Sequence, residues 1–356
     1  MAKSANYLLI GSTEAYSGKS AIALGMACQL QAKGLAIGYG KLLGTCFSGD
    51  RAEGIDDDVQ FVAQTLKLSD SQLQPTLLSL DEVTVHKRLR GEDQTDYRQS
   101  LARLAAAQSP GLVLLEGPAN LEEGRLFDLS VPQVAEAIDA SVLLVVRPLS
   151  QFVDTLLSAK QRLGDRLIGV AINDVPSEQL EVVIGMVRPF LEAHGIPVLG
   201  VLPRSALLRS VSVNELVQQL KADVLCRPDR LDLMVECLSI GAMNVSSAIK
   251  YFRKARNMAV VTGGDRTDIQ LAALESSTQC LILTGHLPPS PLVLSRAEEV
   301  EIPVLSVDLD TLTTVEIIDK AFGSVRLHEV IKVECITQLM AEHFDIDRLI
   351  AKLVKA

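Results

Sequence analysis

The sequence has no tryptophan, only 4% aromatic residues and no cysteine pair with CxxC spacing. Its six cysteines stand far apart, which argues against a zinc site or a disulfide framework and is typical of buried thiols in a reducing compartment. Mean hydropathy is +0.25, yet no apolar run approaches the ~20 residues of a membrane span. The net charge is −10 without a basic stripe, so nucleic acid is not an expected partner.

The N-terminal residues contain neither a long apolar core nor a small-residue cleavage site, so we expect no export signal. Together with the cysteine pattern, this predicts a cytoplasmic protein that does not contact a membrane. Hydrophobic residues make up 48% of the 356 residues, which is enough for packed cores in two domains of ordinary size.

Short β-branched runs alternate with longer amphipathic stretches in the N-terminal part of the chain. Near-continuous apolar strands separated by helices predict an α/β fold with a parallel sheet covered on both faces. The expected strands are 7–10, 36–40, 112–115, 142–146, 167–172 and 198–201, and the expected helices are 18–33, 101–107, 131–138, 152–163 and 178–193.

A second, smaller α/β domain is expected after Pro203. Its predicted strands are 258–261, 280–283 and 304–307, its helices are 213–220, 267–274, 291–300 and 312–322, and the tail 327–354 is largely helical. We therefore expect two domains, 1–205 and 206–356.

The run GSTEAYSGKS, residues 11–20, follows the first expected strand and opens the first expected helix. A strand, a tight loop and Gly-Lys-Ser at a helix start are what a phosphate-binding loop requires, and the alternative is a chance Gly-Lys-Ser. The loop around Ser17 and Gly18 would surround phosphate oxygens. Lys19 would contact the outer phosphates, and the Ser20 hydroxyl would bind magnesium.

Glu14 stands five residues before Lys19, where partitioning ATPases carry a second lysine. With this acidic residue the loop resembles that of dethiobiotin synthetases, and more closely the nucleotide-binding half attached to some bacterial phosphotransacetylases. The resemblance implies a P-loop NTPase sheet that binds ATP and Mg²⁺, with Glu14 in the nucleotide site.

Two further strand ends agree with that resemblance. Lys41 matches a lysine that helps to hold substrate in dethiobiotin synthetases, and a strand's carboxyl edge suits anion binding; a solvated strand-end charge is the alternative. Glu116 follows the apolar run LVLL and resembles the magnesium-binding glutamate of that family. Among the carboxylates 56–58 we assign Asp57 as a magnesium ligand, although the trio equally favours a helix N-terminus.

By resemblance alone, Asn173 would contact the nucleotide base and Pro203 would line the same pocket. Ala15 stands where dethiobiotin synthetases place a small hydroxyl residue, and the bulky Tyr16 follows it. This departure argues against a site built for diaminopelargonic acid. Tyr16 would close the site or meet a partner, or it is an exposed loop aromatic.

The run TGGDRTD, residues 262–268, follows another expected strand and resembles the motif of the DRTGG domain. Its glycines allow close backbone approach or positive φ, and Asp265 or Thr267 is expected to cap the following helix. An anion would bind beside that helix N-terminus, whereas a turn that makes a dimer contact is the alternative. The candidate ligand residues are Gly263, Gly264, Asp265, Arg266 and Thr267.

We expect a regulatory protein that binds Mg-ATP at Lys19, Ser20 and Glu116 and responds to a ligand or subunit contact at its second domain. No acetyltransferase domain or glutaminase elbow follows, so neither activity is expected. One alternative is an ATP-dependent carboxylate-activating ligase with Lys19 and Lys41 as catalytic cations. Another is a nucleotide-independent interaction scaffold, favoured by Thr13 in place of the usual first glycine.

A homo-oligomer is expected, and the scheme also allows a regulatory protein partner. An apolar stripe in the C-terminal helix either forms an interface or packs within the chain. The residues of that stripe are Val330, Val333, Ile336, Leu339 and Met340.

Overall fold

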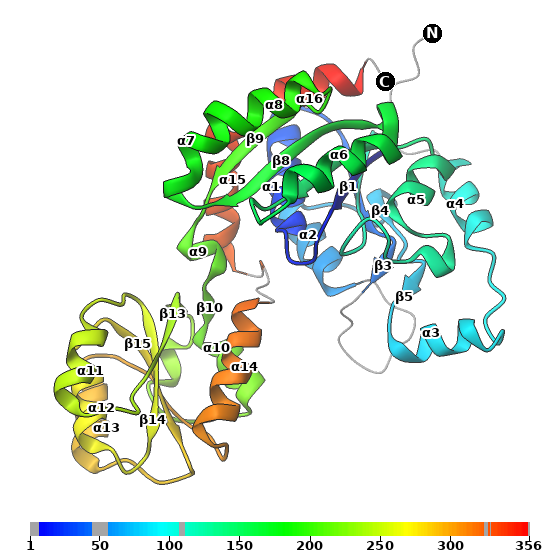
Figure 1. Ribbon diagram of the computed structural model, residues 1–356. Coiled ribbons are helices and arrows are strands. Elements are labelled where there is room, and N and C mark those ends of the chain that lie inside the picture. The colour runs from blue at the N-terminus through cyan, green and yellow to red at the C-terminus, as the bar shows by residue number, and fades with distance from the viewer. Residues whose placement is uncertain (1–6, 45–55, 107–110, 324–326, 328, 355–356) are drawn as a thin grey trace. The chain divides into compact units, whose positions relative to one another are not determined.

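The computed structural model describes residues 7–44, 56–106, 111–323, 327 and 329–354 (Figure 1). The chain divides into two compact units. Unit 1 comprises Met1–Arg204 and Leu327–Ala356, and unit 2 comprises Ser205–Arg326. The first boundary lies next to the expected one, but the C-terminal segment belongs to unit 1, so the expected range 206–356 is wrong at its end.

Unit 1 is built on a seven-stranded sheet in which all neighbouring strands are parallel. Every residue of its central strand β1 is buried, as expected for a sheet covered on both faces. In spatial order the strands are β4 (Leu73–Gln74), β2 (Ile37–Lys41), β6 (Leu112–Glu116), β1 (Tyr7–Ser12), β7 (Ser141–Val146), β8 (Leu167–Val175) and β9 (Val198–Pro203). A separate parallel pair is formed by β3 (Leu43–Gly44) and β5 (Leu78–Ser79).

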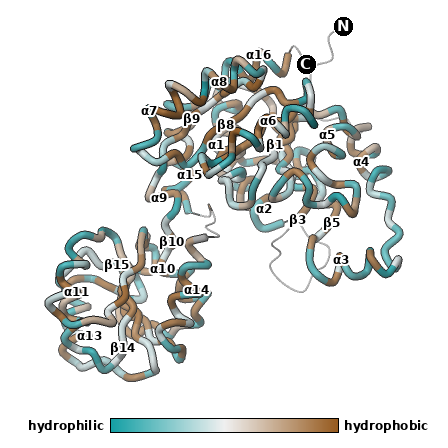
Figure 2. The backbone as a smooth tube through the Cα atoms, viewed as in Figure 1, coloured by the Kyte–Doolittle hydropathy of each residue, from teal (hydrophilic) through white to brown (hydrophobic). Residues whose placement is uncertain are grey.

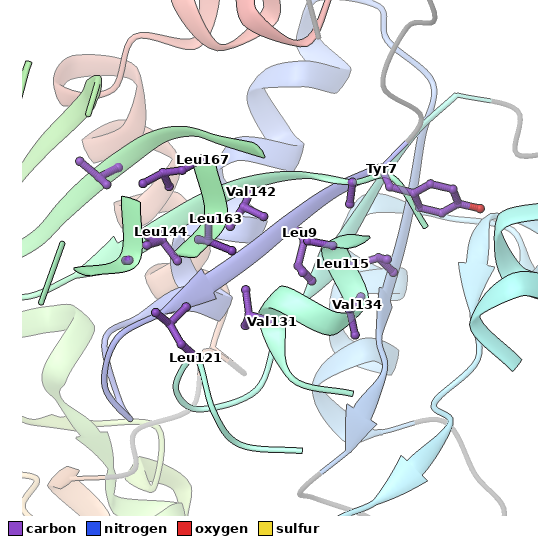
Figure 3. Packing of buried hydrophobic residues seen from close by; sticks show 14 of the residues in the cluster. Tyr7, Leu9, Leu115, Leu121, Val131, Val134, Val142, Leu144, Leu163 and Leu167 are labelled. Atoms are coloured by element: carbon purple, nitrogen blue, oxygen red, sulfur yellow. The ribbon is translucent and has the colours of Figure 1, made fainter. Parts of the chain in front are cut away.

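Helices pack on this sheet through their apolar faces. Val131 and Val134 of helix α5 belong to the same buried cluster as Leu9 and Leu115 of the sheet (Figure 3). The helices of unit 1 are α1 (Lys19–Ala32), α2 (Asp57–Leu66), α3 (Glu82–Leu89), α4 (Tyr97–Ala106), α5 (Val131–Ala137), α6 (Phe152–Leu163), α7 (Leu180–Val182), α8 (Arg188–Ala193), α15 (Val330–His343) and α16 (Ile346–Leu353). The helix expected at 178–193 is interrupted by a π-helical turn, Val183–Val187.

Helix α3 contains no buried residue. A hydrophilic stretch, drawn in teal, joins it to α4 (Figure 2). The guanidinium carbon of Arg88 lies 5.8 Å from the ring centre of Tyr97 and 5.7 Å from that of Phe127. These cation–π contacts add to the packing of the half-buried Val85 of α3 against the core cluster.

The C-terminal segment is built into unit 1 by helix packing and by a sheet contact. A Cβ atom at Gly25 of α1 would lie 2.7 Å from Met340 and 3.1 Å from Ile336, so α15 approaches α1 closely where a side chain is lacking. Phe344 then forms an antiparallel bridge with Gly200 of β9. Part of the predicted apolar stripe, namely Ile336 and Met340, therefore packs within the chain. The sequence alone did not distinguish this packing from an interface with another molecule.

Unit 2 contains a five-stranded sheet in the order β11-β16-β15-β14-β13, parallel except for β11 against β16. Its two edge strands were not expected, because their residues are mostly half-buried or exposed and form no apolar run. The strands of unit 2 are β10 (Val211–Ser212), β11 (Asp223–Cys226), β12 (Met234–Val235), β13 (Cys237–Ile240), β14 (Met258–Gly263), β15 (Thr278–Thr284) and β16 (Val304–Ser306). Its helices are α9 (Ala206–Arg209), α10 (Val213–Leu220), α11 (Val245–Phe252), α12 (Thr267–Leu274), α13 (Pro291–Glu299) and α14 (Thr311–Gly323).

The expectation of buried thiols holds for Cys226 and Cys280, whereas Cys28, Cys237 and Cys335 are only half-buried. Cys46 lies outside the described residues. Burial raises the pKa of the Cys226 thiol to about 12, so it stays protonated at neutral pH.

No helix among the described residues combines the length and the apolar character needed to span a bilayer.

Candidate functional site

Three parallel strands of unit 1 end at the same edge of the sheet. Ile10 of β1 and Lys41 of β2 each stand in register with Glu116 of β6, which lies between these two strands. Since the loops after parallel strands gather at the carboxyl edge, the residues that follow Ile10 meet Glu116 and Lys41 there. The register therefore brings three separately predicted segments to one site.

The phosphate loop is held in shape by Gly18 and Asn173. Gly18 has φ +87°, and a Cβ atom there would lie 2.3 Å from Nδ2 of Asn173. That Nδ2 donates a hydrogen bond to the carbonyl oxygen of Ser17 at 2.9 Å. Asn173 therefore braces the loop itself, and its predicted contact with a nucleotide base stays a prediction.

The Ser17 hydroxyl lies in this loop and is fully buried, yet it has no hydrogen-bond partner among the described residues. A buried hydroxyl without a partner costs free energy, so it favours a ligand that supplies an acceptor. Phosphate oxygens are such acceptors, and the loop precedes the N-terminus of α1. The loop residues thus fit a phosphate group.

The ammonium group of Lys19 is hydrogen-bonded to a neighbouring hydroxyl group. Its Nζ donates to Oγ of Ser12 at 3.0 Å, and that Oγ lies 2.7 Å and 2.8 Å from the carbonyl oxygens of Glu14 and Ala119. Burial lowers the pKa of Lys19, while the negative charge of Glu116 opposes this shift. Within the described ranges the half-buried ammonium group of Lys19 is held by a neutral hydroxyl, and it can exchange this contact for a phosphate oxygen.

Ser20 and Glu116 form the other half of the site. Oγ of Ser20 donates to Oε2 of Glu116 at 2.8 Å, although the two residues are 96 positions apart. Tyr39 donates its hydroxyl proton to the other carboxylate oxygen. Burial raises the pKa of Glu116, and the positive charge of Lys41 acts against that. Paired hydroxyl and carboxylate oxygens beside a phosphate loop fit magnesium, which prefers hard oxygen ligands.

Lys41 is buried rather than solvated, so the alternative of an exposed strand-end charge is wrong. Its Nζ lies 2.8 Å from Oδ2 of Asp58 and 3.2 Å from Oδ2 of Asp56. Asp56 also caps helix α2 by accepting from the backbone N–H of Asp58 at 3.0 Å, as the helix alternative predicted. Asp57 lies half-buried in the first turn of α2, and its role as a magnesium ligand stays a prediction.

Burial lowers the pKa of Lys41, but the attraction of Glu116, Asp58 and Asp56 outweighs burial, and the pKa lies above its ordinary value. We expect Lys41→Met to lower the free energy of unfolding by about 2 kcal/mol, because the buried carboxylate of Asp56 and the half-buried carboxylate of Asp58 lose a charged partner. Urea unfolding followed by circular dichroism measures this loss. Lys87→Met, at an exposed position of α3, is the matched control. An unfolding midpoint equal to that of the control would contradict the structural role of Lys41.

Glu14 is engaged by protein groups. Its carboxylate accepts from the backbone N–H of Arg147 and from the hydroxyl of Thr13, both at 2.8 Å, so its predicted nucleotide contact remains untested. Thr13 does not have positive φ, and the loop forms without the usual glycine there. Tyr16 is 69% exposed, which is the expected alternative of an exposed loop aromatic. Pro203 is half-buried at the end of β9.

In unit 2 the two glycines of the TGGDRTD run permit close approach of backbone segments rather than positive φ. A Cβ atom at Gly264 would lie 2.1 Å from the carbonyl oxygen of Leu287. The buried side chain of Gln270 donates to the carbonyl oxygens of Gly263 and Gly264 at 2.8 Å and 3.0 Å. These contacts fix the turn after β14.

The expected cap of helix α12 is wrong. The N-cap residue is Arg266, and no side chain caps the first turn. Nη2 of Arg266 instead donates to the carbonyl oxygen of Met243 at 2.9 Å, which joins the turn to the segment after β13. Asp265 and Thr267 are thus placed beside the helix start without capping it.

Two known protein families match this chain. Residues 6–212, more than half of the chain, match the family model described as "AAA domain". The chain belongs to the AAA domain family. Residues 215–321 match the model of the DRTGG domain. The predicted order of a P-loop domain followed by a DRTGG domain is confirmed, and the two matches lie mostly in unit 1 and in unit 2.

Curated relatives of this AAA domain protein are phosphate acetyltransferases. That of Synechocystis sp. is 26% identical over 82% of this chain and 43% of its own length, and that of Nitratidesulfovibrio vulgaris is 25% identical over 98% and 52%. The chain therefore spans about half the length of these relatives. The septum site-determining protein MinD of Pyrococcus horikoshii, solved with Mg-ADP, is similar over 57% of this chain and 83% of its own, at 17% identity and a TM-score of 0.34.

Sequence reasoning missed several side chains that hold the predicted ones, among them Ser12, Tyr39 and Arg147. Tyr39 could have been predicted from the sequence, because it stands two positions before Lys41 on β2. Side chains alternate with period two along a strand, so these two side chains lie on the same face. Arg147 follows a buried strand, but nothing local shows that it meets Glu14, which is 133 residues away. That contact depends on the pairing of β1 with β7.

Proposed function

We propose that this chain binds ATP with Mg²⁺ at the phosphate loop and acts as a regulatory protein, with unit 2 as its sensor. The arrangement of Lys19, Ser20 and Glu116 carries the proposal. Among the residues that the structure describes, the ammonium group of Lys19 contacts a neutral hydroxyl, while a hydroxyl and a carboxylate oxygen lie together in a position suited to magnesium. When bound, the metal ion would offset phosphate charge. The chain's own contribution is to orient the phosphates through the loop amides, Lys19 and Ser17.

The proposal is tested by titrating ATP, ADP and AMP into the intact chain in a calorimeter, with Mg²⁺ and with EDTA. We expect Mg-ATP to bind and removal of Mg²⁺ to weaken binding at least about tenfold, because Glu116 otherwise faces the phosphates uncompensated. Glu116→Gln should reduce this dependence on Mg²⁺. Absence of ATP binding would overturn the proposal and leave the interaction scaffold, for which partner capture with and without ATP is the next experiment.

For unit 2 we place the regulatory ligand at the residues Gly263–Thr267, where strand β14 ends and α12 begins without a side-chain cap. The same titration separates this site from the phosphate loop. Binding of AMP that survives substitution of Lys19 would support a ligand site outside the loop, and Arg266→Ala should then weaken it. If all nucleotide binding is lost with Lys19, the nucleotide is not the ligand of unit 2.

A carboxylate-activating ligase is the second candidate, and the burial of Lys41 next to Glu116 favours it. In that case Lys19 and Lys41 would offset the charge that develops during phosphoryl transfer. The ion pairs of Lys41 with Asp56 and Asp58 weigh against it, because an acceptor carboxylate has to compete with two carboxylates already in place. The ligase predicts ADP release that an acceptor stimulates, and a metabolite panel without stimulation would exclude it.

A further inference from the structure

Glu123 lies in the loop that follows β6 and is anchored at three points. The buried side chain of Leu121 belongs to the core cluster and is drawn among it (Figure 3). Oδ1 of Asn120 accepts from the backbone N–H groups of Glu122 and Glu123 at 2.9 Å and 3.0 Å. The backbone N–H of Ala119 donates to Oε2 of Glu123. The carboxylate is thus held at a defined place on a tight loop.

Two further hydrogen bonds connect this loop to the phosphate loop. The carbonyl oxygen of Ala119 accepts from Oγ of Ser12 at 2.8 Å, and the same Oγ accepts from Nζ of Lys19 at 3.0 Å. Burial lowers the pKa of Lys19, and the negative charges of Glu116 and Glu123 act against this shift. The loop of Glu123 is therefore joined to Lys19 through Ser12, and the carboxylate lies close enough for its charge to act on the lysine expected at the outer phosphates.

The other glutamates around Lys19 are engaged on both carboxylate oxygens. Glu116 accepts from Tyr39 on Oε1 and from a serine on Oε2, and Glu14 accepts from Arg147 on Oε1 and from a threonine on Oε2. For Glu123, the contacts within the described ranges involve Oε2 alone. Its Oε1 has no donor there, so this oxygen is able to accept a proton from water.

We propose that Glu123 is the general base of ATP hydrolysis at this site, a step that rests on the proposed binding of Mg-ATP. Oε1 of Glu123 takes a proton from a water molecule as the water oxygen forms a bond to the γ-phosphorus. The bond from that phosphorus to the β–γ bridging oxygen breaks, and its electron pair leaves with ADP. The proton then passes from Glu123 to the released phosphate. Anchoring by Ala119, Asn120 and Leu121 keeps the carboxylate oriented during the step.

The test compares Glu123→Gln with its neighbour Glu122→Gln in the intact chain. Glutamine keeps an oxygen acceptor for the N–H of Ala119 but cannot take the proton. We expect the phosphate release rate of Glu123→Gln to fall about 100-fold, with the calorimetric dissociation constant for Mg-ATP unchanged within about twofold. Glu122 is exposed and pairs with Arg125 and Arg162, so its variant should hydrolyse at the wild-type rate.

Two more readouts separate chemistry from structure. The acid limb of the wild-type pH–rate profile should disappear in Glu123→Gln, and Glu123→Asp should recover part of the rate. If the wild type binds Mg-ATP without turnover, or if Glu123→Gln hydrolyses like the wild type, the inference is overturned while the proposed binding stands. If the wild type does not bind Mg-ATP, the titration overturns the proposed function and this inference together.

Discussion

Lys19→Ala is expected to weaken the binding of Mg-ATP by about 100-fold or more, which corresponds to about 2.7 kcal/mol. The side chain of Lys19 is half-buried, so the attraction of its ammonium group for phosphate oxygens is screened by water less than at an exposed site. Its contact with the neutral Ser12 hydroxyl is easily exchanged for a charged acceptor. Calorimetric titration with Mg-ATP measures the loss directly.

The control for this variant is Lys87→Ala, which removes an exposed lysine from helix α3 in the same unit. It should bind Mg-ATP like the wild type, because Lys87 makes none of the contacts described for the phosphate loop and salt screens an exposed charge. Both variants should retain the wild-type circular dichroism spectrum. If Lys19→Ala binds Mg-ATP within about twofold of the control, the nucleotide site is not at this loop.

Gly18→Ala is expected to abolish nucleotide binding and to lower the free energy of unfolding by about 3 kcal/mol. Part of this loss comes from the left-handed φ of +87°, which costs a residue with a side chain about 1–2 kcal/mol. The rest comes from overlap, because the new methyl group would lie 2.3 Å from Nδ2 of Asn173, which braces the loop at Ser17. Urea unfolding and calorimetric titration measure the two effects separately.

Two further variants separate the cost of the positive φ from the cost of the overlap with Asn173. Gly34 has nearly the same φ, +82°, but no atom lies within 4 Å of the position of an added Cβ. Gly34→Ala should therefore lose only about 1 kcal/mol and keep nucleotide binding. Combining Gly18→Ala with Asn173→Ala should recover stability relative to Gly18→Ala alone, since the overlap is removed. Equal losses for Gly18→Ala and Gly34→Ala would show that overlap with Asn173 has no energetic role.

The site residues that the sequence predicted are those that lie in a recognisable pattern of consecutive residues. A strand, a loop and Gly-Lys-Ser before a helix identified Lys19 and Ser20, and an apolar run that ends in a carboxylate identified Glu116. Among the acidic residues 56–58, sequence could not decide which one approaches Lys41, because neighbouring side chains on a helix start point in different directions. The structure pairs Lys41 with Asp56 and Asp58.

The sequence by itself determined the α/β class, the order of the two domain types and the location of the phosphate loop. These features follow from local patterns: apolar periodicity, turn glycines and helix starts. Each pattern involves residues that are close in the chain, so the sequence alone shows it. Only the tertiary structure decided that the C-terminal helix α15 belongs with α1 and that Ala119 contacts Ser12, which accepts from Lys19. Those contacts join segments about one hundred or more residues apart. Their partners are selected by the strand order of the parallel sheet and by close packing at Gly25, neither of which leaves a local trace in the sequence.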